Sequence, residues 1–240
     1  MVADFRSRDV AAGGQGAPLV PLFHREVFAR PGETVCVLNL GGISNLSVLG
    51  ADGRVLGFDC GPGNALMDHW CQQHTGQPFD DGGRWAASGK RVPGLLEMLM
   101  NEPFLQQMPP KSTGRDLFNP AWLATKLAAF GGAAPADVQA TLLEFTVVSC
   151  ANDLQRHGAG SKTLIVCGGG ALNTALMQRL QAALPGVSVA SSAEFGLPPL
   201  QVEAAAFAWL ARKAVRRETG SLESVTGTRG ARVLGAIYPR

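Results

Sequence analysis

Short runs of apolar and β-branched residues near the N-terminus predict strands. The three runs are 34–39, 45–49 and 54–59. The last two are separated by Asp52-Gly53, which suits a tight turn, so we expect them to form a hairpin. Upstream, residues 9–21 are rich in glycine and proline and predict a loop, whereas 22–29 carry apolar residues at helical spacing. The N-terminal quarter therefore predicts one helix followed by a three-stranded meander.

The pattern then changes to helical spacing. Asn64 is placed to cap a helix over 65–75, residues 77–135 are mainly helical with irregular breaks, and a long helix is expected over 135–157. The remainder alternates as strand 163–167, helix 174–183, strand 187–191, helix 201–217 and a β-like tail at 233–238. This order predicts an α/β fold with a mixed sheet that begins with a three-strand meander. Helices flank the sheet, and a helical insertion covers about 77–157.

The composition excludes several classes of protein. The 240 residues are 46% hydrophobic and 17% charged, so the chain can bury a core, and its formal net charge is only +2. No basic run exceeds Arg216-Arg217, so nothing indicates nucleic-acid binding. No apolar run approaches the length of a membrane span, and the polar residues 4–8 do not resemble a signal peptide.

Cysteine usage predicts a reducing cytoplasm. The cysteines are odd in number and form no CxxC motif. They are Cys36, Cys60, Cys71, Cys150 and Cys167. Three potential metal ligands, His69, Cys71 and His74, are close in sequence but do not share one face of a helix. We therefore expect no protein-held metal site.

Two glycine-rich segments follow strand-like runs and point to a phosphorylated ligand. The first, 39–45, contains Gly41, Gly42 and Asn45; the second, 167–173, contains Gly168, Gly169, Gly170 and Asn173. Glycines at a strand end let backbone N–H groups approach a ligand, and a helix N-terminus attracts anions. A tight hairpin turn explains the first segment equally well. Neither the GxGxxG spacing nor a Walker A motif is present.

Asp59 is the sharpest candidate for catalysis. We expect it at a strand end, followed by Gly61 and Gly63, where a carboxylate can take a proton from water or a hydroxyl. The alternative is an aspartate that merely caps the following turn. Two phosphate loops and one strand-end acid together suggest a small-molecule kinase.

Several charged residues have two possible interpretations, a structural role and a binding role. Glu203 begins a helix, where the helix dipole alone explains an acid. Lys111 and Arg115 could bind an acidic group of a substrate or be solvated surface charges. The same two interpretations apply to Arg6, Arg8 and Asp9.

Longer motifs give a more specific interpretation. They are 2–21 (VADFRSRDVAAGGQGAPLVP), 38–45 (LNLGGISN), 57–64 (GFDCGPGN), 110–115 (PKSTGR), 137–143 (DVQATLL) and 166–171 (VCGGGA). In this order, and along essentially the whole chain, they resemble the anhydro-N-acetylmuramic acid kinase family of the actin-like acetate and sugar kinases. Members of that superfamily have two α/β domains with nucleotide and sugar between them. The resemblance therefore implies an actin-like (ribonuclease H-like) fold.

The same resemblance implies an ATP- and Mg²⁺-dependent enzyme of bacterial peptidoglycan recycling. Its reaction opens the 1,6-anhydro ring of anhydro-N-acetylmuramic acid with water and phosphorylates O6. A homodimer is also implied. Asp59 matches the catalytic aspartate that activates the water. Other residues match the second phosphate segment (Gly41, Gly42, Asn45), the adenosine segment (Gly168, Gly169, Gly170) and positions near the sugar (Glu203, Asp9, Arg8).

The chain departs from the family at its start. The family begins about half a domain earlier, with a first phosphate loop containing Ser-Gly-Thr-Ser that is absent here. We therefore expect an N-terminally truncated member, with 1–224 as the second domain and 225–240 as a segment that returns toward the first. Two alternatives stay open: a fragment that only binds sugar or nucleotide, and a related kinase with a different sugar. Residues 110–116 and Glu203, which we expect to face the sugar, would discriminate the second alternative.

Overall fold

The apolar runs of the sequence form one mixed five-stranded sheet in the computed structural model, which describes residues 1–239. The strands are β2 (Val35–Leu40), β3 (Ile43–Leu49), β4 (Val55–Pro62), β5 (Thr163–Cys167) and β6 (Ser188–Ser191). Their order is β4-β3-β2-β5-β6; the β2–β3 and β3–β4 pairs are antiparallel, and β2–β5 and β5–β6 are parallel. The predicted α/β fold class, with a meander at the start of a mixed sheet, is confirmed.

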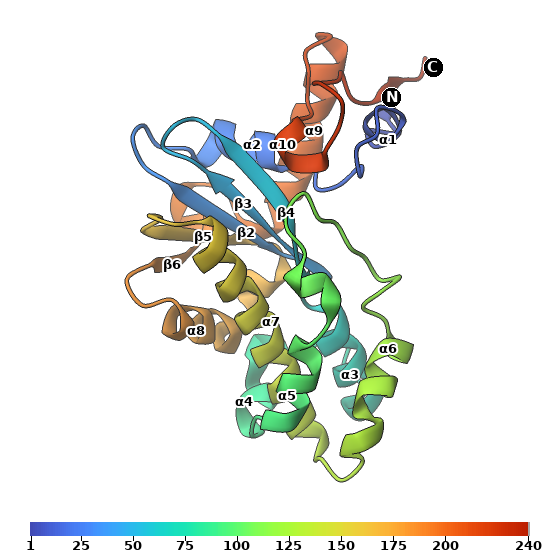
Figure 1. Cartoon of the computed structure of the whole chain (residues 1–240), viewed down its shortest axis with the longest axis vertical. Helices are drawn as coiled ribbons and strands as arrows, with labels where there is room; N and C mark the ends of the chain where they lie inside the picture. The colour runs from blue at the N-terminus through green and yellow to red at the C-terminus, as the bar shows by residue number, and fades with distance from the viewer. Residues whose placement is uncertain (240) are drawn as a thin grey trace.

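Both faces of this sheet are buried, which explains its apolar strands. Cys36, Leu38 and Leu40 of β2 pack into the larger core cluster with α7 and α8. Val35 and Val37 point to the other face and pack with residues of α2 and α9. Successive side chains of a strand alternate between faces, so one strand contributes to both clusters. Figure 1 shows the resulting layers, with α2, α9 and α10 on one face and α7 and α8 on the other.

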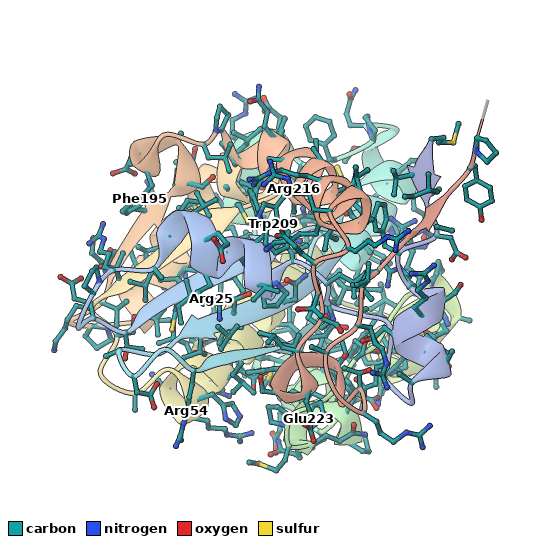
Figure 2. All side chains as sticks on the ribbon, turned by 90° about the horizontal axis from the view of Figure 1, so that it is seen from above. Arg25, Arg54, Phe195, Trp209, Arg216 and Glu223 are labelled. Carbon is teal, nitrogen blue, oxygen red and sulfur yellow. The ribbon has the colours of Figure 1, made fainter. Side chains whose placement is uncertain are left out.

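Helices cover the sheet largely where the sequence predicts them. On one face lie α2 (Pro21–Phe28), α9 (Val202–Val215) and α10 (Glu223–Thr226); on the other lie α3 (Ala65–Thr75), α7 (Pro135–His157) and α8 (Thr174–Ala183). In Figure 2, seen from above, α2 and α9 lie side by side, and Trp209 of α9 is 6.1 Å from Phe23 of α2 between ring centroids. The left-handed residue Gly76 (φ 75°) ends α3, as expected for a helix C-terminus.

The predicted helical insertion is also present. It contains α4 (Arg84–Ser88), α5 (Pro93–Met100) and α6 (Pro120–Leu127), interrupted by short 3₁₀ turns, before α7 returns to the sheet. Proline stands at the first turn of α5, α6 and α7, where its missing N–H costs nothing. The segment between α5 and α6 reaches back to the end of β4 (Figure 1).

Three expectations need correction. Residues 9–21 are not all loop, because α1 (Ser7–Ala11) enters that stretch. Residues 43–45 belong to β3, so the first glycine segment is a turn of only two residues. Asp59 does not end its strand: β4 continues to Pro62 because an unpaired residue interrupts its register with β3 and pairing then resumes.

The two ends of the described chain pair with each other. β1 (Val2–Ala3) and β7 (Ala236–Ile237) form a small antiparallel sheet, visible beside the N and C labels in Figure 1. All five cysteines are free and buried. Among residues 1–239 no helix is both long enough and apolar enough to span a membrane.

Candidate functional site

A row of polar side chains crosses four neighbouring strands on the α2/α9 face of the sheet. In register, Cys167 of β5 lies opposite Asn39 of β2, Asn39 opposite Asn45 of β3, and Asn45 opposite Asp59 of β4. Paired residues project to the same face of a sheet, so these four side chains form one line. Cys167 ends β5, and the row therefore lies at the carboxyl ends of the parallel strands, where α/β sheets bind ligands.

A cavity of about 330 Å³ opens above this row. It brings together five of the residues that the sequence singles out, although they come from three separate parts of the chain. They are Gly41, Gly42, Asn45, Asp59 and Glu203. Arg6 and His24 also line the cavity, whose other walls come from the segment after α1 and from the start of α9. The structure thus groups the predicted acid, one predicted glycine segment and the predicted glutamate.

Asp59 is held from one side only. Its side chain is 5% exposed, and Oδ2 accepts hydrogen bonds from Ser112 Oγ and Thr113 N, both at 2.9 Å. The Asp59 N–H donates to the Lys111 carbonyl at 3.0 Å. No hydrogen bond from residues 1–239 reaches Oδ1. One carboxylate oxygen is therefore fixed, and the other is free to accept a proton.

Competing effects act on the Asp59 carboxyl. Burial raises its pKa above the ordinary value, because the charged form loses hydration. The hydrogen bonds from Thr113 and Ser112 lower the pKa, and so do the positive charges of Arg6 and Lys111. A buried carboxylate with a raised pKa is a stronger base than one in water.

Lys111 does not face this cavity. Its ammonium is fully buried behind the sheet, where it forms an ion pair with Asp153 of α7, with Nζ 3.1 Å from Oδ2. The same ammonium lies 5.5 Å from the Phe58 ring centroid and 5.2 Å from that of Phe104. Of the two interpretations left open for Lys111, neither holds; its role is structural.

Arg115 lies next to the Gly41-Gly42 turn. A Cβ placed on Gly42 would be 3.3 Å from Nη2 of Arg115, and the Arg115 charge lowers the pKa of Asp68 on α3. Burial of Asp68 outweighs that charge and raises its pKa to about 6. Arg115 thus sets a positive charge beside the first glycine segment.

The Gly41-Gly42 turn is tied to the start of α3. The Gly41 carbonyl accepts from Asn64 N at 2.8 Å, and the Gly42 carbonyl accepts from Gly63 N at 2.9 Å. A Cβ on Gly63 would come within 2.3 Å of the Gly41 oxygen, so glycine is required for this close approach. The turn therefore lines the first cavity and fixes Asn64 on its other side.

The second glycine segment belongs to a different cavity. Gly169 and Asn173 line a space of about 380 Å³ together with Asn64, Asp68 and apolar side chains. The sequence suggests that these glycines open the following helix. Instead, Gly169–Leu172 form a 3₁₀ turn that precedes α8. Asn173 then caps α8, with its Oδ1 accepting from Leu176 N at 3.0 Å. The apolar side chains are Phe79, Leu172 and Leu200, all more than half exposed.

Comparison with known proteins identifies the family. The profile of the anhydro-N-acetylmuramic acid kinase family matches residues 1–240. The chain belongs to this family. The anhydro-N-acetylmuramic acid kinases of Variovorax paradoxus and Albidiferax ferrireducens are 70% and 61% identical to it. Both alignments cover 100% of this chain but only 65% and 67% of those relatives. The chain thus spans about two thirds of their length.

Solved structures give only distant similarity. The activator of the 2-hydroxyisocaproyl-CoA dehydratase from Clostridium difficile, with bound ADPNP, has a TM-score of 0.44 and 13% identity, and the alignment covers 85% of this chain and 68% of that one. Component A of the Acidaminococcus fermentans (R)-2-hydroxyglutaryl-CoA dehydratase has a TM-score of 0.48 and 14% identity, with 78% and 64% covered. These similarities are too distant to bear on function.

Two predicted residues of this family member lie away from the first cavity. Asp9 is fully buried; its Oδ2 accepts from Gly16 N at 2.8 Å and its Oδ1 from Thr226 Oγ1 at 2.7 Å. Arg8 is exposed and donates to the Val233 carbonyl at 3.2 Å. In this structure Asp9 stabilises the loop after α1, and neither side chain lines the cavity.

Other residues at or beside the first cavity were not singled out individually from the sequence. Ser112 and Thr113 lie in the PKSTGR motif and Asn39 in LNLGGISN, so the motifs pointed to the right segments without giving the roles. His24 had no sequence signal, because a histidine on an amphipathic helix is ordinary. It is fully buried, its Nδ1 lies 2.8 Å from Ser47 Oγ, and burial lowers its pKa to about 3.

Potential metal ligands are sparse in the described chain. Within residues 1–239 no group of three or more His, Cys, Asp or Glu side chains is arranged to hold an ion. Mg²⁺ bound with nucleotide phosphates needs only one or two protein carboxylates. Asp68 at the second cavity is an oxygen ligand of the type that Mg²⁺ prefers.

Proposed function

We propose that this chain carries the base and part of the nucleotide site of an ATP-dependent anhydro-N-acetylmuramic acid kinase. The reaction would open the 1,6-anhydro ring with water and phosphorylate O6, giving N-acetylmuramic acid 6-phosphate and ADP. The observation that carries the proposal is the state of Asp59, a buried carboxylate with one oxygen fixed and the other free at the cavity. Membership of the family supports the substrate and the reaction.

Asp59 would act as the general base. Its Oδ1 takes a proton from a water molecule as that water attacks C1 of the sugar, and the C1–O6 bond breaks. The released O6 then attacks the γ-phosphorus of ATP, and ADP leaves. One carboxylate suffices, because transfer of the phosphoryl group traps the oxygen that leaves C1.

The remaining residues would bind and orient the two substrates. Glu203 and Asn45 line the same cavity as Asp59 and would contact the sugar. Asn45, which the resemblance places in the second phosphate segment, is the strand partner of Asp59, so we propose a contact with the sugar for it as well. Gly41 and Gly42, with Arg115 beside them, would lie against the phosphates, and Gly169 with Asn173 would lie against the adenosine. Gly168 and Gly170 would shape that turn.

The apolar side chains around the second cavity suit a purine base. Phe79, Leu172 and Leu200 project there beside polar groups of Asn64 and Asn173. Mg²⁺, held by the phosphates with Asp68, would neutralise negative charge during transfer.

The family assignment also supports proposals on domain organisation, pathway, compartment and oligomeric state. We propose residues 1–224 as the second of two kinase domains and 225–240 as a segment that returns toward the first. We further propose a place in peptidoglycan recycling in the cytoplasm, and a homodimer. Each of these depends on the family assignment.

The test is a coupled ADP-release assay with this chain, ATP, Mg²⁺ and anhydro-N-acetylmuramic acid, with N-acetylglucosamine as the comparison substrate. ADP release that depends on the anhydro sugar supports the proposal. A preference for N-acetylglucosamine would instead indicate a related sugar kinase. Calorimetric binding of sugar or nucleotide without ADP release would mean that the chain binds but does not turn over.

A further inference from the structure

The segment 111–113 makes three hydrogen bonds to Asp59, two to its side chain and one to its backbone. We infer that this segment is a positioning clamp that fixes the Asp59 carboxylate with Oδ1 toward the cavity, and that Ser112 is the side chain within it that holds the proposed base by donating to Oδ2. The inference rests on the proposed role of Asp59 as the general base. Ser112 and Thr113 are positioning residues, since their bonds go to Oδ2 and not to the substrate.

The clamp restricts a torsion that is otherwise loose. The terminal torsion of an aspartate is broad and nearly two-fold, so an unrestrained carboxylate would rotate between orientations. Two donors, Ser112 Oγ and Thr113 N, meet the same oxygen at 2.9 Å. The Asp59 backbone is fixed to the segment as well, through its N–H and the Lys111 carbonyl. Side chain and main chain of Asp59 are thus both held by three consecutive residues.

The clamp is itself anchored in the core. Lys111 projects away from the cavity, and its Nζ lies 3.1 Å and 3.4 Å from the two oxygens of Asp153. The side chains of this pair are 0% and 4% exposed, which ties the segment to α7. Ser112, the next residue, points to Asp59. The two adjacent side chains therefore have different roles: Lys111 attaches the segment to the core, and Ser112 contacts the proposed base.

The hydrogen bond from Ser112 changes the Asp59 pKa in a known direction. A hydroxyl that donates to a carboxylate stabilises the charged form, and this bond lowers the Asp59 pKa against the effect of burial. Without the Ser112 hydroxyl, less counteracts the effect of burial, so the Asp59 pKa rises. Because a hydrogen bond to a charged group stabilises the charged form, its removal should raise the Asp59 pKa by about one unit.

The first test measures the Asp59 carboxyl without requiring turnover. The ¹³C-aspartate-labelled chain is titrated by NMR, with the Asp59 signal assigned by its loss in Asp59→Asn. We expect Ser112→Ala to raise the Asp59 pKa by about one unit, Ser112→Thr to retain the wild-type value, and Ser88→Ala to change nothing. Ser88 is a matched control, because its hydroxyl donates to the exposed Trp85 carbonyl. An Asp59 pKa unchanged in Ser112→Ala overturns the inference.

A kinetic test separates positioning from packing. For Ser112→Ala we expect kcat to fall roughly tenfold with little change in the KM of the sugar, because the base is misplaced but the cavity is intact. The acid limb of the kcat profile should move to higher pH, and Ser112→Thr should restore it. An unchanged kcat and pH profile would contradict the clamp. Absence of turnover in the wild-type chain would count against the proposed function, while the NMR titration would still decide the clamp.

Discussion

Asn45 and Asp59 face each other across β3 and β4, immediately before the register of the two strands is interrupted. The next pair is Ser44 with Gly61, so Cys60 is an extra residue on β4. Such a bulge bends a strand and redirects its side chains, and bulges recur next to active sites. Here it lies directly after the acid of the proposed site, and the strand then continues to Pro62 beside the glycine turn.

Replacement of the proposed base tests the centre of the site. Asp59→Asn keeps the shape of the side chain but cannot accept a proton, so product formation should fall by roughly 10²–10⁴-fold. Nucleotide affinity should stay nearly unchanged, because the glycine turns are intact. Coupled ADP release and calorimetry with ATP measure the two effects separately. Turnover close to that of the wild type would exclude Asp59 as the base.

The buried ion pair behind the site should matter for stability. Lys111→Met leaves Asp153 buried without its partner, and breaking such a pair typically costs about 3–5 kcal/mol in the free energy of unfolding. Adding Asp153→Asn should recover part of the loss, since no charge then stays uncompensated. Urea unfolding measures both.

Lys213→Met is the matched control for that experiment. Lys213 also forms an ion pair, at 2.7 Å from Glu218, and lies 5.0 Å from the Trp209 ring centroid, but Glu218 is 43% exposed. A pair in contact with solvent contributes far less to stability than a buried one. Equal losses for the two lysines would show that burial is not what makes Lys111 important.

Two adjacent glycines should respond differently to alanine. Gly168 has φ +80°, and a Cβ there would lie 2.7 Å from the Leu40 carbonyl oxygen, so Gly168→Ala should destabilise the fold by about 1–3 kcal/mol. Gly169 has no such strain; its Cβ would meet only Asn64 Nδ2 at 3.6 Å. Gly169→Ala should therefore fold normally but bind ATP roughly tenfold more weakly, since it lines the second cavity. ATP binding unaffected by Gly169→Ala would remove this turn from the nucleotide site.

His24 should make stability depend on pH. Its pKa is about 3 in the folded chain and ordinarily 6.5, so the unfolded chain binds the additional proton between these values. Stability from this group is fully present above pH 6.5 and is lost as the pH falls toward 3, at up to about 1.4 kcal/mol per pH unit.

The difference between wild type and His24→Phe isolates this dependence. The raised pKa values of Asp59 and Asp153 act in the opposite direction over part of the same range, and they are common to both proteins. Urea unfolding at several pH values should show a steeper loss of stability for the wild type below pH 6.5. Parallel curves would show that His24 does not titrate as a buried neutral side chain.

The sequence alone determined the elements and the chemical types of residue in the site. Continuous apolar runs identified β2 to β5, because burial on both faces of a sheet requires them. Gly76 marked a helix end and Pro135 a helix start, because glycine favours the left-handed C-cap and proline suits the first turn. Asp59 and the glycine segments stood out because an acid near a strand end suits proton transfer and glycines suit phosphate binding, although a turn cap and a hairpin turn explained them as well.

Only the tertiary structure decided which of these residues meet. Strand register aligns Asp59 with Asn45 and Asn39, and register depends on pairing between distant segments rather than on local pattern. A bulge cannot be read from spacing, so Asp59 was expected at a strand end. Lys111 and Ser112 are neighbours in the chain, yet one is buried in an ion pair and the other contacts the base. The sequence specifies the charge of each side chain and whether it can donate or accept a hydrogen bond. Packing decides how deeply the side chain is buried and which group it contacts, and burial and contacts together set its pKa and its role.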